Sequence, residues 1–328
     1  MDTRREFITR SAAAALATGL AGPAAFAQVE GWPNRPIRFF CGFPPGGVAD
    51  IVARIIAQPL SARLGQPVVV DNRSGAGGVI AVETVAKSAP DGYTIGFGVS
   101  GALTSSVTLL KLPYAPLKDI EPLTVVVLNP IVLCVAASSP IKTLAEFIAA
   151  AKAAPGKFNY GTAGPGTAMN LAGELLKQKA GFDMAHAPYK GSAPAATDLL
   201  GGHITSAIID YTTAKPHLQS GRLRALGQTT ARRSAVVPDV PTFAEAGVKG
   251  YEFNSWFGLI MPPGTPQPIV QRMHSEVVAV LKDPAVVKQL NDAGSDPQPT
   301  TPAAMRAQIQ REIALTSELI KSADIKVN

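Results

Sequence analysis

Two glycine-rich turns carry the residues most suited to chemistry, because each turn lies between a strand-like run and a helix-like run. The first is FPPGG at 43–47, after the apolar run 37–41, and the second is GTAGPGT at 161–167, before a helical pattern at 168–179. A turn that opens a helix exposes free backbone N–H groups and the positive end of the helix dipole, which together bind anions. Two such turns in different halves of the chain predict one small anion held between two lobes.

In the first turn, we expect the backbone amides of Gly46, Gly47 and Val48 to bind one carboxylate group, with Phe43 covering an apolar part of the ligand. Glycine at these positions would equally serve a tight turn that needs positive φ. Asp50 falls in the first turn of the predicted helix, where an acidic residue caps the helix or compensates its dipole. Its functional alternatives are to accept a hydrogen bond from a ligand amine or water, or to brace the loop.

In the second turn, the expected donors are backbone amides and two hydroxyl groups, from Thr162, Ala163, Gly164, Gly166 and Thr167. Thr167 would also be an ordinary helix N-cap, and the two roles are compatible. The glycines do not form G-x-G-x-x-G, and no acidic residue follows at the ribose spacing, so a dinucleotide site is rejected.

Four further residues are candidates for the ligand site. Ser100 and Thr104 follow the strand-like run 94–99, at the edge where ligands bind in open α/β sheets. Tyr189 is expected to line the cleft. Asp210 ends a strand and is expected to take a ligand amine or to fix water, whereas His186 is expected to be a structural hydrogen-bonding residue.

Signatures of catalysis are missing from the sequence. It contains no G-x-S-x-G, P-loop or H-E-x-x-H motif, and its four histidines and two cysteines lack metal-ligand spacing. We therefore expect no catalytic residue, no metal and no cofactor. An exported α/β enzyme acting on an anionic substrate is the disfavoured alternative. Cys41 and Cys134 are expected to be buried free thiols.

Strand and helix patterns alternate along the chain, which predicts an α/β fold. The expected strands are 37–41, 67–70, 94–99, 123–136, 158–160, 204–209, 223–227 and 256–261. The expected helices are 50–64, 78–87, 144–153, 168–179, 194–200, 266–281 and 302–322. Pro59 is expected to kink or end the first of these helices.

The run 123–136 is long for a strand and is broken by Asn129-Pro130, so we expect the chain to cross there from one lobe to the other. A return crossing is expected between Thr229 and Phe257. The predicted organisation is a discontinuous first lobe, 28–128 plus 251–328, and an inserted second lobe, 129–250. Both lobes have ordinary domain sizes.

The first 27 residues have the pattern of a signal peptide: arginines, a small apolar run at 11–26 and an A-x-A site at 25–27. The start TRREFI at 3–8 also resembles the twin-arginine export signal. The formal net charge of +6 is scattered along the chain, without the basic stripe of a nucleic-acid-binding protein.

Eight short motifs follow one another in an order that resembles a known family. They are GFPPGGVAD at 42–50, DNRSGAGG at 71–78, PDGYT at 90–94, YGTAG at 160–164, HAPYKG at 186–191, PDVPT at 238–242, WFG at 256–258 and PPGTP at 262–266. Together they are similar to the solute-binding proteins of tripartite tricarboxylate transporters, the Bug family of Bordetella and relatives. The resemblance covers essentially the whole chain after the signal peptide.

The resemblance implies a two-lobed periplasmic binding protein, type II-like, with the ligand cleft between the lobes. It implies a small carboxylate as ligand, the membrane permease subunits of such a transporter as partners, and a monomer in the periplasm. A periplasmic ligand sensor partner is the alternative that fits the same site.

Export predicts a processed protein. Because the A-x-A site ends at Ala27, mass spectrometry of the protein from the periplasm should show a chain that begins near Gln28. An uncleaved chain in the cytoplasm of the native host would contradict this prediction.

Overall fold

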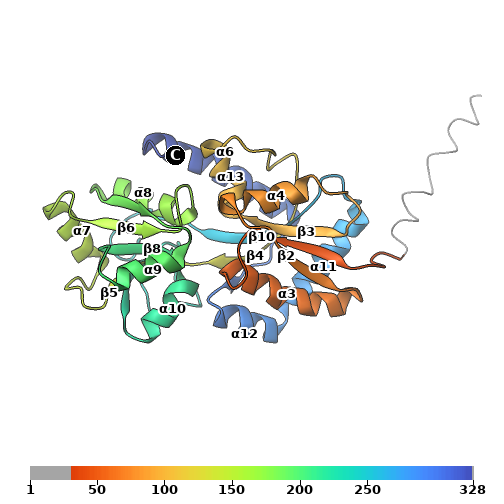
Figure 1. The fold of residues 1–328 in the computed structure, drawn as a ribbon, viewed down its shortest axis with the longest axis horizontal. Helices are drawn as coiled ribbons and strands as arrows, with labels where there is room; N and C mark the ends of the chain where they lie inside the picture. Colours follow the sequence, from red (N-terminus) through yellow and green to blue (C-terminus); the bar gives the residue numbers. More distant parts are fainter. Residues whose placement is uncertain (1–30, 327–328) are drawn as a thin grey trace, which may run out of the picture.

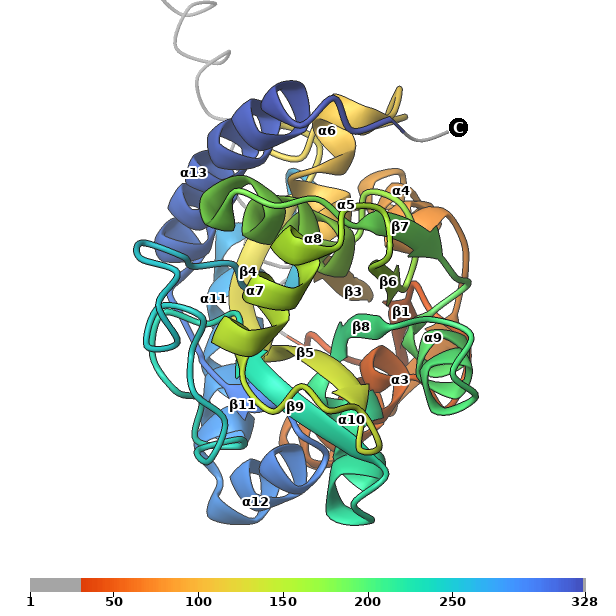
Figure 2. The same cartoon turned by 90° about the vertical axis from the view of Figure 1, so that its left-hand side faces the viewer.

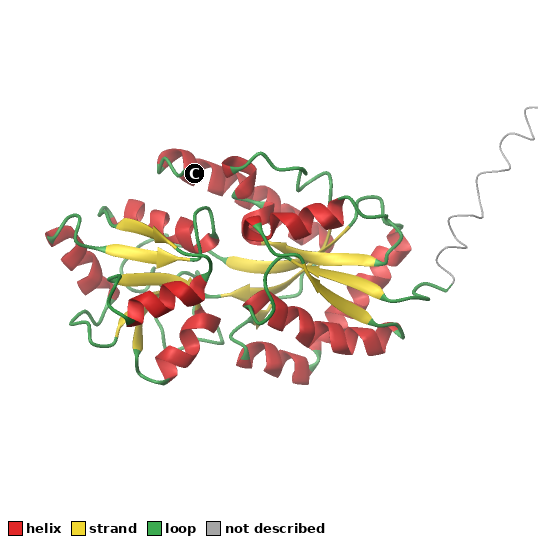
Figure 3. Cartoon of the chain, viewed as in Figure 1, coloured by secondary structure: helices red, strands yellow, loops and turns green. Residues whose placement is uncertain are grey.

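The computed structural model describes residues 31–326, so the expected signal peptide at 1–27 lies outside the described residues. The chain forms two lobes that lie side by side, each built on its own sheet with helices on both faces (Figures 1 and 3). This arrangement confirms the predicted α/β, two-lobed fold. Within residues 31–326, no helix has the length and apolar character needed to cross a membrane.

The first lobe contains a six-stranded sheet in the order β11-β4-β10-β3-β1-β2. Its strands are β1 (Ile37–Cys41), β2 (Val68–Asn72), β3 (Thr94–Val99), β4 (Glu121–Asn129), β10 (Ser255–Met261) and β11 (Asp296–Pro297). Its helices are α3 (Val48–Leu64), η1 (Ala76–Gly78), α4 (Val79–Ala86), α5 (Ser100–Leu103), α6 (Ser106–Leu109), α11 (Gln267–Lys282) and α12 (Pro284–Asp292). Every residue of β10 is buried, as expected of a strand covered on both faces.

The second lobe, which faces the viewer in Figure 2, contains a five-stranded sheet in the order β7-β6-β8-β5-β9. Its strands are β5 (Ile131–Ala136), β6 (Asn159–Thr162), β7 (Ala185–Pro188), β8 (Ser206–Asp210) and β9 (Leu223–Gln228). Its helices are α7 (Leu144–Ala153), α8 (Ala168–Ala180), α9 (Ser192–Leu200) and α10 (Tyr211–Gln219).

The two sheets share one strand plan. In the first, β2, β1 and β3 are parallel neighbours, followed by antiparallel β10 and then β4. In the second, β7, β6 and β8 are parallel neighbours, followed by antiparallel β5 and then β9. Therefore β1 corresponds to β6 and β3 corresponds to β8, although no repeat is visible in the sequence.

The predicted elements are largely present, and four have the predicted bounds without change: β1, β3, α7 and α13 (Pro302–Ser322). The long run at 123–136 is two strands, β4 and β5, that meet at Pro130 as expected. Of the two alternatives predicted for Pro59, an end of the helix is not seen, because α3 continues through Pro59 to Leu64, and a kink there stays a prediction. Ile56 and Leu60 are fully buried on either side of it, so packing offsets the lost backbone hydrogen bond. Sequence patterns missed β7, β11, α5, α6, α10 and α12.

Helix α13 connects the two cores. Met305 and Ile309 in its first half belong to the core of the first lobe, and Leu319 and Ile320 belong to the core of the second. The helix begins where Thr301 accepts the N–H of Ala304, with a proline at the next position.

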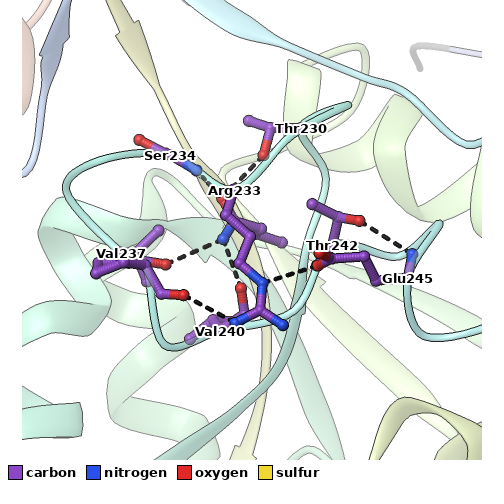
Figure 4. Close-up of polar contacts among 9 residues, drawn as sticks. Thr230, Arg233, Ser234, Val237, Val240, Thr242 and Glu245 are labelled. Carbon is purple, nitrogen blue, oxygen red and sulfur yellow. Dashed lines mark hydrogen bonds and ion pairs between the residues drawn. The ribbon is translucent and has the colours of Figure 1, made fainter.

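The return segment after β9 is organised by buried Gln228. Its amide nitrogen donates to the carbonyls of Val237 and Val240, and its side-chain oxygen accepts from the Thr230 hydroxyl and the Ser234 N–H (Figure 4). All the hydrogen-bonding groups of a buried amide side chain are therefore used, as burial requires. This arrangement fixes the loop next to the place where the chain returns from the second lobe to the first. The exact bounds of the two lobes remain a prediction.

Trp256 on β10 is fully buried, and its Nε1 donates to both carboxylate oxygens of Glu312 on α13, at 2.9 and 2.8 Å. Burial raises the pKa of Glu312, although hydrogen bonds from Gln308 and Trp256 act in the opposite direction. A carboxyl group whose pKa is raised by folding favours the folded state only below its unfolded pKa, and this contribution is lost as the pH rises through the folded pKa.

Glu312→Gln keeps an acceptor for Trp256 and removes the buried charge. We expect its melting temperature to exceed that of the wild type at pH 7, and the difference to vanish near pH ~4, where the wild-type carboxyl group is protonated. Glu318→Gln changes an exposed residue of the same helix and serves as the control. Equal melting temperatures at pH 7 would contradict the prediction.

Candidate functional site

The predicted site residues lie at or just after the carboxyl ends of β1, β3, β6, β7 and β8. A turn follows β1, β6 and β7, whereas β3 and β8 lead directly into α5 and α10. Contacts connect the two turns across the lobes. Within the first lobe, Gly78 lies between the first turn and α5, because a Cβ placed on Gly78 would lie 3.5 Å from the Phe43 ring and 3.9 Å from Ala102 in α5. At the end of α5, the Ser105 hydroxyl donates to the carbonyl of Gly166 in the second lobe, at 2.9 Å. The structure therefore brings both glycine turns to one region between the lobes.

In the turn of the first lobe, Gly46 has a φ of 81°, and its N–H donates to Asp50 Oδ2 at 2.9 Å. The Gly47 N–H points back to the carbonyl of Pro44 at 3.3 Å. Helix α3 then begins, and among the described residues the N–H groups of Val48, Ala49 and Asp50 have no hydrogen-bond partner. These are the orphan donors of a helix start, a kind of group that can bind an anion.

Asp50 braces this turn. The residue is buried, and its carboxylate pairs with Arg54 at 2.9 Å and accepts from Asn72, whose amide nitrogen also donates to the carbonyl of Phe43. Burial acts to raise the pKa of Asp50, but the hydrogen bonds from Arg54, Gly46 and Asn72 outweigh it and lower that pKa. The carboxylate is thus ionised and compensated by Arg54. Binding of a ligand amine by Asp50 stays a prediction.

The turn of the second lobe has the same construction. Gly166 has a φ of 71°, and its N–H donates to Asn170 Oδ1 at 3.1 Å. The Gly164 N–H donates to Thr162 Oγ1, and the Thr167 hydroxyl donates to the carbonyl of Gly164 while capping α8. Over residues 31–326, the donors left without a partner at this turn are the N–H groups of Ala163, Ala168 and Met169.

In both turns, a glycine that follows proline gives its N–H to a polar side chain four residues later: Gly46 to Asp50, and Gly166 to Asn170. We call this arrangement the glycine clamp. It uses the glycine N–H internally and leaves the next N–H groups of the helix start free. Of the predicted amide donors, Val48 and Ala163 are free among the described residues, whereas four already have an internal partner: Gly46, Gly47, Gly164 and Gly166. Ligand binding by any of these residues remains a prediction.

Behind the second turn, a polar network supports the clamp. The Asn170 amide nitrogen donates to the Tyr160 hydroxyl, which donates to Glu174 at 2.6 Å. Thr162 Oγ1 lies 2.7 Å from His186 Nε2, so His186 has the structural role expected from the sequence. Burial lowers the pKa of His186, which favours its neutral form.

The other predicted residues are already engaged in hydrogen bonds. The Thr104 hydroxyl donates to the carbonyl of Ser100, whose own hydroxyl lies 3.5 Å from the N–H of Trp256. The Tyr189 hydroxyl donates to Asp198, so its ring is the part available to a ligand. Asp210 accepts from the Ser192 hydroxyl at 2.7 Å, and burial raises the pKa of this carboxyl group.

The sequence interpretation overlooked Ser105, Asn170 and Ser192. For Asn170 a signal was present, because PGGVAD at 45–50 and PGTAMN at 165–170 share a proline, a glycine and a final Asp or Asn. For Ser105 the sequence contained no such signal, because its partner, Gly166, is distant in the chain.

Cys41 and Cys134 are buried free thiols, as expected. Between residues 31 and 326, no group of three or more His, Cys, Asp or Glu side chains is placed to hold a metal ion. A separate surface pocket of about 480 Å³ lies beside β9 and includes none of the predicted site residues.

Known proteins share both the sequence and the fold. The model of the tripartite tricarboxylate transporter family receptor matches residues 52–325. The protein BugT of Bordetella pertussis is 37% identical over 309 residues, covering 94% of this chain and 95% of BugT. The chain therefore belongs to the tripartite tricarboxylate transporter receptor family, and the resemblance seen in the sequence is confirmed.

Two solved structures of relatives contain a carboxylate. Rpa4515 of R. palustris with adipate is 37% identical and superimposes with a TM-score of 0.83, covering 90% of this chain and 99% of that one. MatC of Rhodopseudomonas palustris with bound malate is 33% identical, with a TM-score of 0.78 and coverage of 88% and 100%.

The two clamps differ in charge, which predicts different effects of matched substitutions. Asp50→Asn keeps an acceptor for Gly46, and we expect affinity for a small carboxylate to change by less than about threefold. Asn170→Asp places a charge next to the free amides of α8 and near Glu174, and we expect affinity to fall by about tenfold or more, equivalent to ~1.4 kcal/mol.

Isothermal titration of both variants tests this contrast, with melting temperatures as the control for folding. Asn170→Asp protein that is folded and binds as tightly as the wild type would show that α8 does not contact the anion.

Proposed function

We propose that this chain is an extracytoplasmic solute-binding protein that captures a small carboxylate between its lobes and delivers it to the permease subunits of a tripartite tricarboxylate-type transporter. One observation carries the proposal: two clamped turns leave free N–H groups at the starts of α3 and α8, one in each lobe. Relatives with adipate and with malate support a carboxylate as the ligand.

The recognition in this proposal is by backbone amides. The two cations that flank the first turn in the sequence are both paired, Arg38 with Asp71 and Arg54 with Asp50, so neither gives the anion a free charge. Helix-start amides bind a carboxylate by charge-assisted hydrogen bonds and by the dipole of the helix. Dicarboxylates fit two opposed turns best, because each end of the ligand meets one helix start.

The remaining parts of the proposal rest on the family and the signal pattern. The protein acts in the periplasm as a monomer and catalyses no reaction, since receptors of this family bind substrate for a transporter. Its lobes are 28–128 plus 251–328 and 129–250. A sensor that presents its bound ligand to a membrane receptor would use the same site, and no observation here favours it over transport.

A thermal-shift panel tests the ligand class. Adipate, malate, succinate and benzoate should be compared with glucose and with Mg²⁺ on the processed protein. We expect at least one carboxylate to raise the melting temperature, because a ligand at 100 times its Kd stabilises the folded state by about 2.7 kcal/mol. Shifts with glucose or Mg²⁺ alone would contradict the proposal.

A further inference from the structure

Ser105 lies between α5 and α6 in the first lobe and is fully buried. Its hydroxyl is 2.9 Å from the carbonyl oxygen of Gly166 and 3.2 Å from that of Gly101. A hydroxyl has one hydrogen to donate, and the shorter contact is the one that crosses between the lobes. Across residues 31–326, no other side chain of the first lobe hydrogen-bonds to residues 161–167.

Gly166 is therefore fixed at both of its backbone polar groups. Its N–H is bound by Asn170 of its own lobe, and its carbonyl is bound by Ser105 of the opposite lobe. The free amides of Ala168 and Met169 follow within three residues. The orientation of Gly166 thus sets where those amides point.

The approach of α5 depends on a small residue at position 101. A Cβ on Gly101 would lie 3.9 Å from the carbonyl oxygen of Gly166 and 3.7 Å from Ser105 Oγ, which is ordinary van der Waals contact. An alanine fits in this space, whereas a longer side chain would have to displace the turn.

We propose that Ser105 is a positioning residue that couples closure of the lobes to the ligand site. Its hydroxyl reaches Gly166 only when the lobes are together, and this bond orients the amides of α8 toward the ligand. The same hydrogen bond engages the Gly166 carbonyl oxygen, so this oxygen repels a bound anion less. The inference rests on the proposed function and adds a residue that senses the closed state.

The test compares Ser105→Ala with Ser106→Ala, using adipate and malate as probes. Ser106 is adjacent, and within the described part of the chain its hydroxyl makes no hydrogen bond. We expect Ser105→Ala to raise the Kd about tenfold, mainly through faster dissociation, because loss of a bond made in the closed state affects koff more than kon. Ser106→Ala should change Kd by less than about twofold.

A second pair of variants leaves the hydroxyl in place. Gly101→Ala should bind normally, and Gly101→Leu should bind weakly because its side chain blocks the approach of α5 to Gly166. Small-angle scattering should show less ligand-induced compaction for Ser105→Ala and Gly101→Leu than for the wild type.

The outcomes separate the two proposals. If the wild type binds the probes and Ser105→Ala binds them with unchanged Kd, koff and compaction, the role of Ser105 is overturned and the proposed function stands. If the wild type binds no carboxylate, the proposed function is overturned, and the role of Ser105 falls with it.

Discussion

The hydrogen bond from a turn glycine to a side chain four residues later is the interaction on which the candidate site depends. It binds the N–H of Gly46 to Asp50 and that of Gly166 to Asn170, with both glycines at positive φ. Without an acceptor, each N–H would be one more orphan donor, and the glycine would be free to take other conformations. With it, the turn is held in one conformation, and free N–H groups follow at the start of each helix.

The shared strand plan explains why the two clamps occur at equivalent places in the two lobes. Strands β1 and β6 occupy equivalent places in the two sheets, so the turns that follow them leave equivalent edges. The clamps nonetheless differ in charge. Asp50 is ionised and compensated by Arg54, whereas Asn170 is neutral and backed by Tyr160 and Glu174. A charged side chain can occupy such a position only where a cation compensates it, because an uncompensated carboxylate there would oppose an anion.

The sequence revealed those features that depend on local chemistry. Apolar runs and helix starts located β3, α7 and α13, and the glycine turns were found because glycine and proline act locally. Strand β7 was missed because its four residues AHAP are partly exposed and end in proline, and α10 was missed because two threonines and Pro216 obscure its pattern. Ser105 could not be recognised, since its role arises from contact with a residue 61 positions away. Which amides remain free is likewise decided by the folded turn.

In the proposed site, backbone amides select the class of ligand, and side chains between the turns have to select its identity. Amides at a helix start bind any carboxylate with little regard to the rest of the molecule. Discrimination requires contacts with that remainder, from apolar surfaces such as the Phe43 and Tyr189 rings or from polar groups such as Asp210. The relatives with adipate and with malate superimpose on this chain with TM-scores of 0.83 and 0.78, so one framework accommodates ligands of different length and polarity. We therefore expect substitutions between the two turns to change which carboxylate is bound, and substitutions in the clamps to change whether a carboxylate is bound at all.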